Sequence, residues 1–120
     1  MGKIGFVLTL GPYTHQNTDT TLRMVNAALE EGHEVVGVYL YVDGVYNVSN
    51  RIDPKSEEER NIARMFERLA TRGVPVKVCP VCGHYRGIND EKIMVKGVEF
   101  DGLGALAEIF EAADKVVALT

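Results

Sequence analysis

Two cysteines lie close together in the segment Cys79–Gly87, whose sequence is CPVCGHYRG. The apolar run Val74–Val78 comes directly before them and predicts a short buried strand. Pro80 cannot continue a strand but fits the first turn of a helix, so Cys79 is expected at a strand-to-helix corner, exposed at the edge of a sheet. The free N–H groups and positive dipole end of the helical turn would favour a thiolate there. A thiolate in that position is a nucleophile.

The residues that follow the first cysteine favour the same chemistry. Arg86 and His84 are expected within one or two helical turns of the Cys79 sulfur, where a cation helps to hold an anionic sulfur species. Cys82 adds a second thiol three residues after the first. The sequence therefore predicts a catalytic role for Cys79 and Cys82 and a binding role for Arg86 and His84.

Three other interpretations of the cysteine pair stay open. Free cysteines are often small buried core residues. The spelling Cys-Pro-x-Cys-Gly is also that of a zinc-ribbon or rubredoxin knuckle, but a tetrahedral site needs four ligands, so His84, another histidine or a second subunit would have to complete it. A Cys79–Cys82 disulfide would close too small a loop to stabilise the fold much, and would rather be a switchable redox pair.

Composition limits the kind of protein. The chain has 120 residues, 46% of them apolar and 25% charged, which predicts a single domain over residues 1–120 with a real hydrophobic core. The net charge of −4 comes without a lysine or arginine cluster, so nucleic acid and anionic membranes are poor candidate partners. Two cysteines make no disulfide framework, and no signal peptide is visible, which favours a reducing, cytoplasmic location.

The first half of the chain reads as a parallel β-α-β unit. An apolar strand is expected over Lys3–Leu10, then a helix that is capped by Thr18 or Asp19 and ends at Gly32. A second strand, Glu34–Val42, follows after a link short enough for parallel pairing. Among the loop histidines, His15 is a weak candidate for function and His33 is expected to be a surface turn residue far from the site.

After the second strand, the segment 43–50 is long and apolar at its centre, which is typical of a loop that shapes a site or contacts another subunit. Tyr46 and Asn47 are its binding candidates, and the alternative is that Val45 and Tyr46 fold back onto the core. A capped helix start is expected at Ser56, and the helix should then bury one apolar stripe and end at Gly73. The stripe consists of Ile62, Met65, Phe66 and Leu69.

The last third of the chain should complete the sheet. Residues 88–100 show no sustained period and predict at most a small extra strand. A helix is expected over Gly102–Glu111, where Gly102 and Gly104 would let the backbone pack closely beside the cysteine segment, and the strand Lys115–Leu119 ends the chain. These elements predict an α/β fold with a doubly wound, mainly parallel sheet of about five strands flanked by helices in a flavodoxin-like layering.

Four motifs in the same order resemble the DsrE/DsrF-like family of sulfur-relay proteins, and most of all its DsrE and TusD members. The resemblance runs from Ile4 to Leu119. Its motifs are EGHEV at 31–35, YVDGVYN at 41–47, Cys79 seven residues before Arg86-Gly87, and GLGALAE at 102–108.

The resemblance implies a doubly wound α/β fold, assembly into homotrimers, hexamers or hetero-oligomers with related subunits, and partner proteins that donate and accept sulfur. It implies that Cys79 takes up sulfane sulfur as a persulfide, as in relays for tRNA thiolation or sulfur oxidation, with no metal or organic cofactor. Pro80, Cys82 and Gly83 depart from TusD-like sequences, which have small apolar residues there. A second thiol could attack a Cys79 persulfide and leave a disulfide, so a dithiol oxidoreductase and a metal-binding assembly module remain alternatives.

Overall fold

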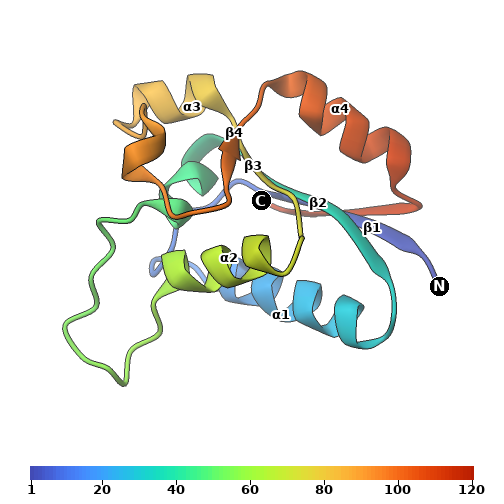
Figure 1. Ribbon diagram of the computed structural model, residues 1–120, viewed down its shortest axis with the longest axis horizontal. Helices are drawn as coiled ribbons and strands as arrows, with labels where there is room; N and C mark the ends of the chain where they lie inside the picture. The colour runs from blue at the N-terminus through green and yellow to red at the C-terminus, as the bar shows by residue number, and fades with distance from the viewer.

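The computed structural model describes residues 1–120 and contains one five-stranded sheet with the strand order β4-β3-β2-β1-β5 (Figure 1). All four strand pairings are parallel. The predicted doubly wound α/β fold is therefore confirmed. The strands are β1 (Lys3–Leu8), β2 (Glu34–Leu40), β3 (Val76–Val78), β4 (Glu99–Phe100) and β5 (Lys115–Leu119).

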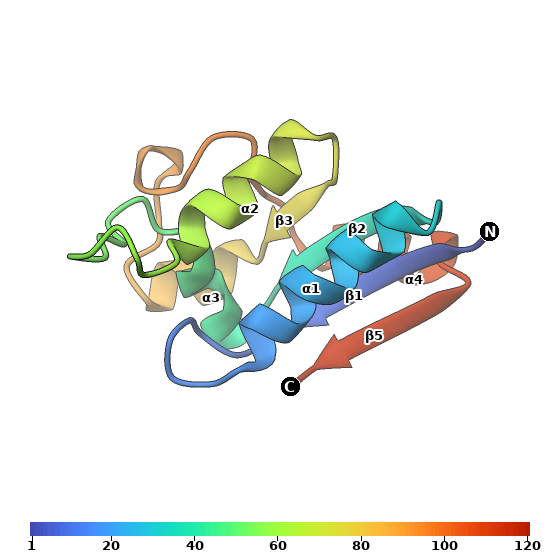
Figure 2. The same cartoon turned by 90° about the horizontal axis from the view of Figure 1, so that it is seen from below.

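Helices cover the two faces of the sheet unequally. The α-helices are α1 (Asn17–Glu30), α2 (Ile62–Thr71), α3 (Pro80–Tyr85) and α4 (Leu103–Ala112), and the 3-10 helices are η1 (Val42–Val48) and η2 (Glu91–Ile93). Figures 1 and 2 show α1 and α2 side by side on one face of the sheet, with α4 on the other. The chain moves from β1 outward to β4 and then returns past β1 to β5, so a right-handed crossover puts α4 on the opposite face. None of the helices is long and apolar enough to cross a membrane.

The core lies mainly between the sheet and the pair α1 and α2. Phe6, Leu8, Val38 and Leu40 from the two central strands are at most 1% exposed, as expected for strands covered on both faces. From the helices, the predicted residues Ile62, Phe66 and Leu69 are buried with Leu22 and Val25, while Met65 is only partly buried. The apolar periodicity of the sequence thus predicted the inward face of each helix.

The predicted start of the second long helix at Ser56 is wrong. The helix α2 begins at Ile62, and Asn61 caps it by accepting a hydrogen bond from the Arg64 N–H at 3.1 Å. The segment before it is instead tied to the first loop, because the Tyr13 hydroxyl donates to the Arg60 carbonyl at 2.9 Å and accepts from the Ile62 N–H at 3.1 Å. A partner distant in the sequence therefore decides where this helix starts.

The predicted caps of the first helix are also wrong. The helix α1 begins at Asn17 without a side-chain cap. Asp19 instead forms a bidentate ion pair with Arg60, with 3.0 Å between Oδ2 and Nη2. The two central strands end earlier than expected, at Leu8 and Leu40, because the chain turns into loops that lie over the carboxyl edge of the sheet.

The loop after β2 forms the 3-10 helix η1, which packs against α2 and α3. Val45 is fully buried, as the alternative interpretation of this loop had it, whereas Tyr46 is 40% exposed. Asn47 is fully buried, and its amide donates to the carbonyls of Leu10 and Gly44, both at 2.9 Å, while its Oδ1 accepts from the Thr18 hydroxyl. The side-chain amide of Asn47, a predicted binding residue, is thus hydrogen-bonded within the fold, where it holds its own loop against β1 and α1.

We expect Gly44→Ala to destabilise the fold by about 2 kcal/mol or more, because a methyl group at position 44 would collide with the backbone carbonyl of Leu8. The matched control is Gly104→Ala, where nothing lies within 4 Å of the added carbon and a helical alanine should stabilise by about 0.5–1 kcal/mol. Urea unfolding of both variants measures the two effects. Equal stability of the two would contradict the close contact between η1 and β1.

Candidate functional site

The predicted strand-to-helix corner is present at Cys79. This residue follows β3 and is the N-cap of α3, and Pro80 occupies the first helical position. The Cys79 N–H donates to the Leu40 carbonyl of β2 at 3.0 Å, and the Cys79 carbonyl accepts from the Gly83 N–H at 3.0 Å. The Cys79 Sγ accepts the Cys82 N–H at 3.5 Å, so the first turn of α3 aims a donor at the sulfur.

The expectation that Cys79 is exposed is wrong. Its relative exposure is 4%, and it belongs to the hydrophobic core cluster. Side chains alternate along a strand, so Cys79 projects to the same side of the sheet as Lys77, which lines the hollow beside α4. Cys82 is half-buried, and both thiols are free. The second cysteine is therefore the more accessible of the two.

Tyr39 is a residue of the site that the sequence analysis missed. It is fully buried on β2, and its hydroxyl donates to the Asp101 carbonyl at 2.9 Å. Burial raises the pKa of Tyr39 far above the ordinary phenol value, and the charge of Cys79 acts in the same direction. A signal was present in the sequence, because a tyrosine is the one side chain with a polar end in the run Val35–Leu40.

The thiol of Cys82 is kept protonated by its surroundings. Burial and a hydrogen bond to Cys79 raise the pKa of Cys82, and the negative charge of a Cys79 thiolate acts in the same direction. The backbone N–H of Val42 and the charge of Arg86 oppose the rise. Cys82 therefore stays the thiol at neutral pH, while its backbone N–H donates to the Cys79 sulfur.

Arg86 lies near the pair as predicted, but its charge is already paired. Its Nε donates to Asp43 Oδ1 at 2.7 Å, and its Nη1 donates to the Cys82 carbonyl at 3.1 Å. The hydrogen bond that Arg86 donates to Asp43 raises the pKa of Arg86. The arginine thus fastens α3 to η1, and it does not stand free to receive an anionic sulfur.

Neither His84 nor His33 is hydrogen-bonded to Cys79 or Cys82. His84 is exposed, and its Nδ1 donates to the Pro80 carbonyl one turn back at 2.8 Å. His33 accepts the Gly2 N–H at 2.9 Å beside the start of β1, which agrees with the surface turn predicted for it. No cluster of three or more histidine, cysteine or carboxylate side chains that could hold a metal ion is present in the chain.

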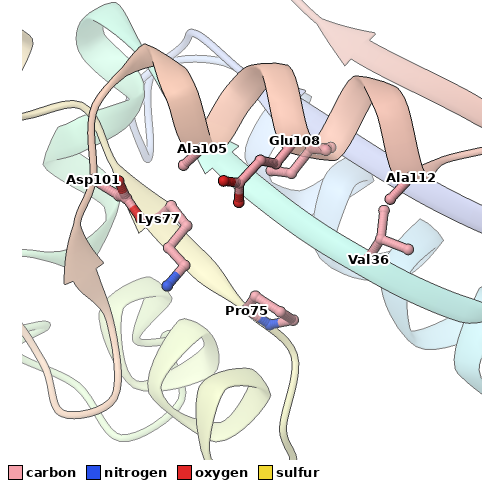
Figure 3. Close-up of a pocket in the computed structure, with 8 residues that line it drawn as sticks. Val36, Pro75, Lys77, Asp101, Ala105, Glu108 and Ala112 are labelled. Atoms are coloured by element: carbon pink, nitrogen blue, oxygen red, sulfur yellow. The ribbon is translucent and has the colours of Figure 1, made fainter.

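Two hollows flank the site. One, of about 410 Å³, lies over the carboxyl ends of β1 and β2 and is lined by Asp43, Tyr46, His15 and neighbouring loop residues, so it adjoins the Asp43–Arg86 pair. The other, of about 330 Å³, lies between α4 and the sheet, with Lys77, Asp101 and Glu108 along its polar side (Figure 3). Tyr46 therefore remains a binding candidate at the mouth of the first hollow.

The two glycines at the start of α4 do not pack closely, contrary to expectation. Nothing lies within 4 Å of a side chain built at Gly102 or Gly104. Gly102 is the N-cap of α4 and follows Asp101, whose carbonyl binds Tyr39, so this helix start is joined to the site through the preceding residue. The glycines leave open surface there, and no close backbone approach uses them within the chain.

The model of the DsrE/DsrF-like family matches residues 2–119. The chain belongs to this family. The chain is 34% identical over 123 aligned residues to proteins named sulfurtransferase TusD from Salmonella typhi and Salmonella paratyphi B, and these alignments cover 92% of the chain and 95% of each relative. The family predicted from the four motifs is thereby confirmed.

Solved structures agree with this family assignment. The crystal structure of the ychN protein from E. coli superposes with a TM-score of 0.85 at 33% identity, covering 98% of this chain and 99% of that one. MTH1491 from Methanobacterium thermoautotrophicum superposes with a TM-score of 0.70 at 15% identity, with the same coverage, and shows likeness of fold alone.

We expect Asp43→Asn to speed alkylation of Cys82 about two- to fivefold at neutral pH. The asparagine removes the carboxylate that neutralises Arg86, so the arginine charge lowers the pKa of Cys82 and more thiolate is present. Arg86→Gln should slow the reaction for the opposite reason. Iodoacetamide labelling followed by peptide mapping gives both rates.

A matched control for this experiment is Asp53→Asn, which removes an exposed carboxylate paired with Lys55 at 3.7 Å in another loop. This variant should alkylate at the wild-type rate. Equal rates for Asp43→Asn, Arg86→Gln and the control would show that the Asp43–Arg86 pair has no influence on the thiol.

Proposed function

We propose that this protein is a sulfur carrier of the sulfurtransferase type, which accepts sulfane sulfur as a persulfide on Cys79 and passes it to an acceptor thiol. The proposal depends above all on the position of Cys79, whose sulfur caps a helix start in a chain 34% identical to relatives named sulfurtransferase TusD. A cap position supplies N–H donors to an anionic sulfur, which is the form that both uptake and transfer need.

The chemistry needs no oxidant and no cofactor. A Cys79 thiolate attacks the terminal sulfur of a donor persulfide, a new S–S bond forms on Cys79, and the donor leaves as a thiolate. In the second step an acceptor thiolate attacks the terminal sulfur of the Cys79 persulfide, and Cys79 leaves as the thiolate. Each step exchanges one S–S bond for another, so the electron count does not change.

A dithiol-disulfide oxidoreductase is the second candidate. The observation that favours it is the contact between the two free cysteines, in which the Cys82 N–H faces the Cys79 sulfur at 3.5 Å. The Cys82 thiol could attack Cys79 of the persulfide, which would form the Cys79–Cys82 disulfide and release sulfide. The two candidates therefore differ in the fate of the bound sulfur.

We expect wild-type protein to gain one sulfur atom on Cys79 after incubation with a persulfide donor, and Cys79→Ser to gain none. Tandem mass spectrometry of the alkylation-protected peptide locates the added atom. Cys82→Ser is the matched control, and under the carrier proposal it keeps its sulfur uptake because it retains the cap position and the first thiol.

Two results would decide against the carrier. Absence of sulfur from Cys79 of the wild-type protein, or full transfer by Cys79→Ser, would remove the proposed relay residue. Sulfide release with disulfide formation in the wild-type protein, together with a stable persulfide in Cys82→Ser, would favour the dithiol oxidoreductase.

We also propose that the chain self-associates through the face that carries α4, and that it works in the cytoplasm with sulfur-donor and sulfur-acceptor proteins. Parallel sheets are normally covered on both faces, yet a hollow remains beside α4. Leu103 and Phe110 on this helix are 56% and 52% exposed. A second copy of the chain, in a trimer or hexamer, would cover these apolar residues.

We expect light scattering of the purified protein to give a trimer or hexamer, and Phe110→Glu to shift it towards the monomer because a buried carboxylate would be desolvated. Met24→Glu is the matched control, since Met24 is also partly exposed but belongs to α1, the helix on the opposite face of the sheet from α4 (Figure 2). A monomeric wild-type protein, or loss of assembly with the control alone, would overturn this assignment of the interface.

A further inference from the structure

The side chain of Tyr39 crosses the middle of the site. Tyr39 lies on β2 and pairs with Lys77 of β3, while Asp101 follows β4 on the far side of β3 and donates its N–H to the Val78 carbonyl at 3.0 Å. Neighbouring strands lie about 4.8 Å apart, so a phenol that starts on β2 and reaches the Asp101 carbonyl at 2.9 Å must extend over β3.

Cys79 projects from the end of β3 at the place that the phenol crosses. It lies two residues after Lys77, so both side chains point to the same side of the strand as Tyr39, the register partner of Lys77. Burial and the nearby charge of Cys79 raise the pKa of Tyr39, as expected for a phenol and a thiol that lie close together on the same side of the sheet. Tyr39 is 0% and Cys79 4% exposed, so this pair has little access to solvent.

The cations near the sulfur are already paired. Lys77 Nζ lies 2.8 Å from Glu99 Oε2, and Arg86 Nε lies 2.7 Å from Asp43 Oδ1. A negative charge on Cys79 therefore depends on neutral donors. The titratable or charged groups that surround it are Tyr39 from β2, Lys77 from β3, Cys82 and Arg86 from α3, Asp43 from η1 and Asp101 after β4.

We propose that the Tyr39 hydroxyl is a switching hydrogen-bond donor to the reacting sulfur, which turns its single proton from the Asp101 carbonyl to Cys79 when that sulfur carries negative charge. In the resting thiol the phenol proton goes to Asp101, and the phenol oxygen can accept the Cys79 S–H. In the thiolate the sulfur has lost its proton, so the same oxygen is free to donate to it. The role deepens the proposed function, on which it rests, by adding a residue that stabilises the anion before attack and after departure of the acceptor.

Tyr39→Phe tests this role because it removes only the hydroxyl. A hydrogen bond to a charged group corresponds to about one pH unit or more, so the midpoint of the Cys79 alkylation profile should rise by about one unit in the variant. Below the midpoint the rate at a fixed pH should fall about tenfold. Iodoacetamide labelling across a pH series, read by tandem mass spectrometry of the peptide that holds both cysteines, gives the profile.

Tyr41→Phe is the matched control. Tyr41 is the next tyrosine on the same side of the chain, with its ring centroid 6.0 Å from that of Tyr39, and its hydroxyl has no hydrogen-bond partner in the chain. The control should keep the wild-type midpoint. A packing effect of losing one phenol oxygen would slow or speed alkylation at every pH without moving the midpoint, so the midpoint separates the two explanations.

A second measurement covers the case in which Tyr39→Phe does not fold. Site-specific replacement of Tyr39 by 3-fluorotyrosine keeps the ring and strengthens the donor, so the midpoint should fall. An unchanged midpoint in either Tyr39 variant would overturn the proposal. The readout uses no sulfur donor, so it is independent of the persulfide-loading test: a wild-type protein that takes up no sulfur defeats the carrier function, whereas an unmoved midpoint defeats only the role of Tyr39.

Discussion

The site depends on the way in which the short strand β3 is held at its end between two neighbours. The Cys79 N–H binds the Leu40 carbonyl of β2, and the Val78 carbonyl accepts the N–H of Asp101 after β4, both at 3.0 Å. With the backbone fixed on both sides, Cys79 has to take the N-cap position, and the first turn of α3 has to present the Cys82 N–H to its sulfur. The chemistry therefore follows from strand pairing that no residue near the cysteines determines alone.

The electrostatic design of the site uses neutral donors. Arg86 forms an ion pair with Asp43, and this pair joins α3 to η1. An unpaired arginine at this position would instead attract anions unselectively. Burial leaves Cys82 protonated, so the pair of thiols carries at most one charge. In the proposed carrier, neutral donors such as the Cys82 N–H would stabilise an anionic sulfur without binding it as tightly as an unpaired cation would, which suits a group that has to be passed on.

The sequence was informative wherever a local pattern decides the structure. The period of the apolar residues predicted the inward faces of α1 and α2, and Pro80 after an apolar run predicted the corner at Cys79. It failed where a distant residue takes over a local role: Asp19 pairs with Arg60 and does not cap α1, and Asn61 caps α2 in place of Ser56. Tyr39 was missed for the same reason, because its partner Asp101 is 62 residues away. The burial of Cys79 could not be read from the sequence either, since it depends on which side of the sheet the end of β3 faces.

Burial of Cys79 is consistent with a carrier when the geometry of a persulfide is considered. The thiol itself is 4% exposed, but a persulfide extends the side chain by one S–S bond of about 2 Å. In the proposed carrier the transferable atom is then the terminal sulfur, while the sulfur that stays behind is the buried Sγ of Cys79, which accepts the Cys82 N–H. An acceptor thiolate that reaches the site therefore meets the terminal sulfur first, and attack on that atom transfers it to the acceptor. Attack on the buried Sγ of Cys79 would instead release the terminal sulfur as sulfide. The half-buried Cys82 is the other thiol of the chain and lies beside the Cys79 Sγ. The same geometry therefore favours sulfur transfer to an acceptor from outside, whereas attack by Cys82 on the Cys79 Sγ would release the sulfur as sulfide.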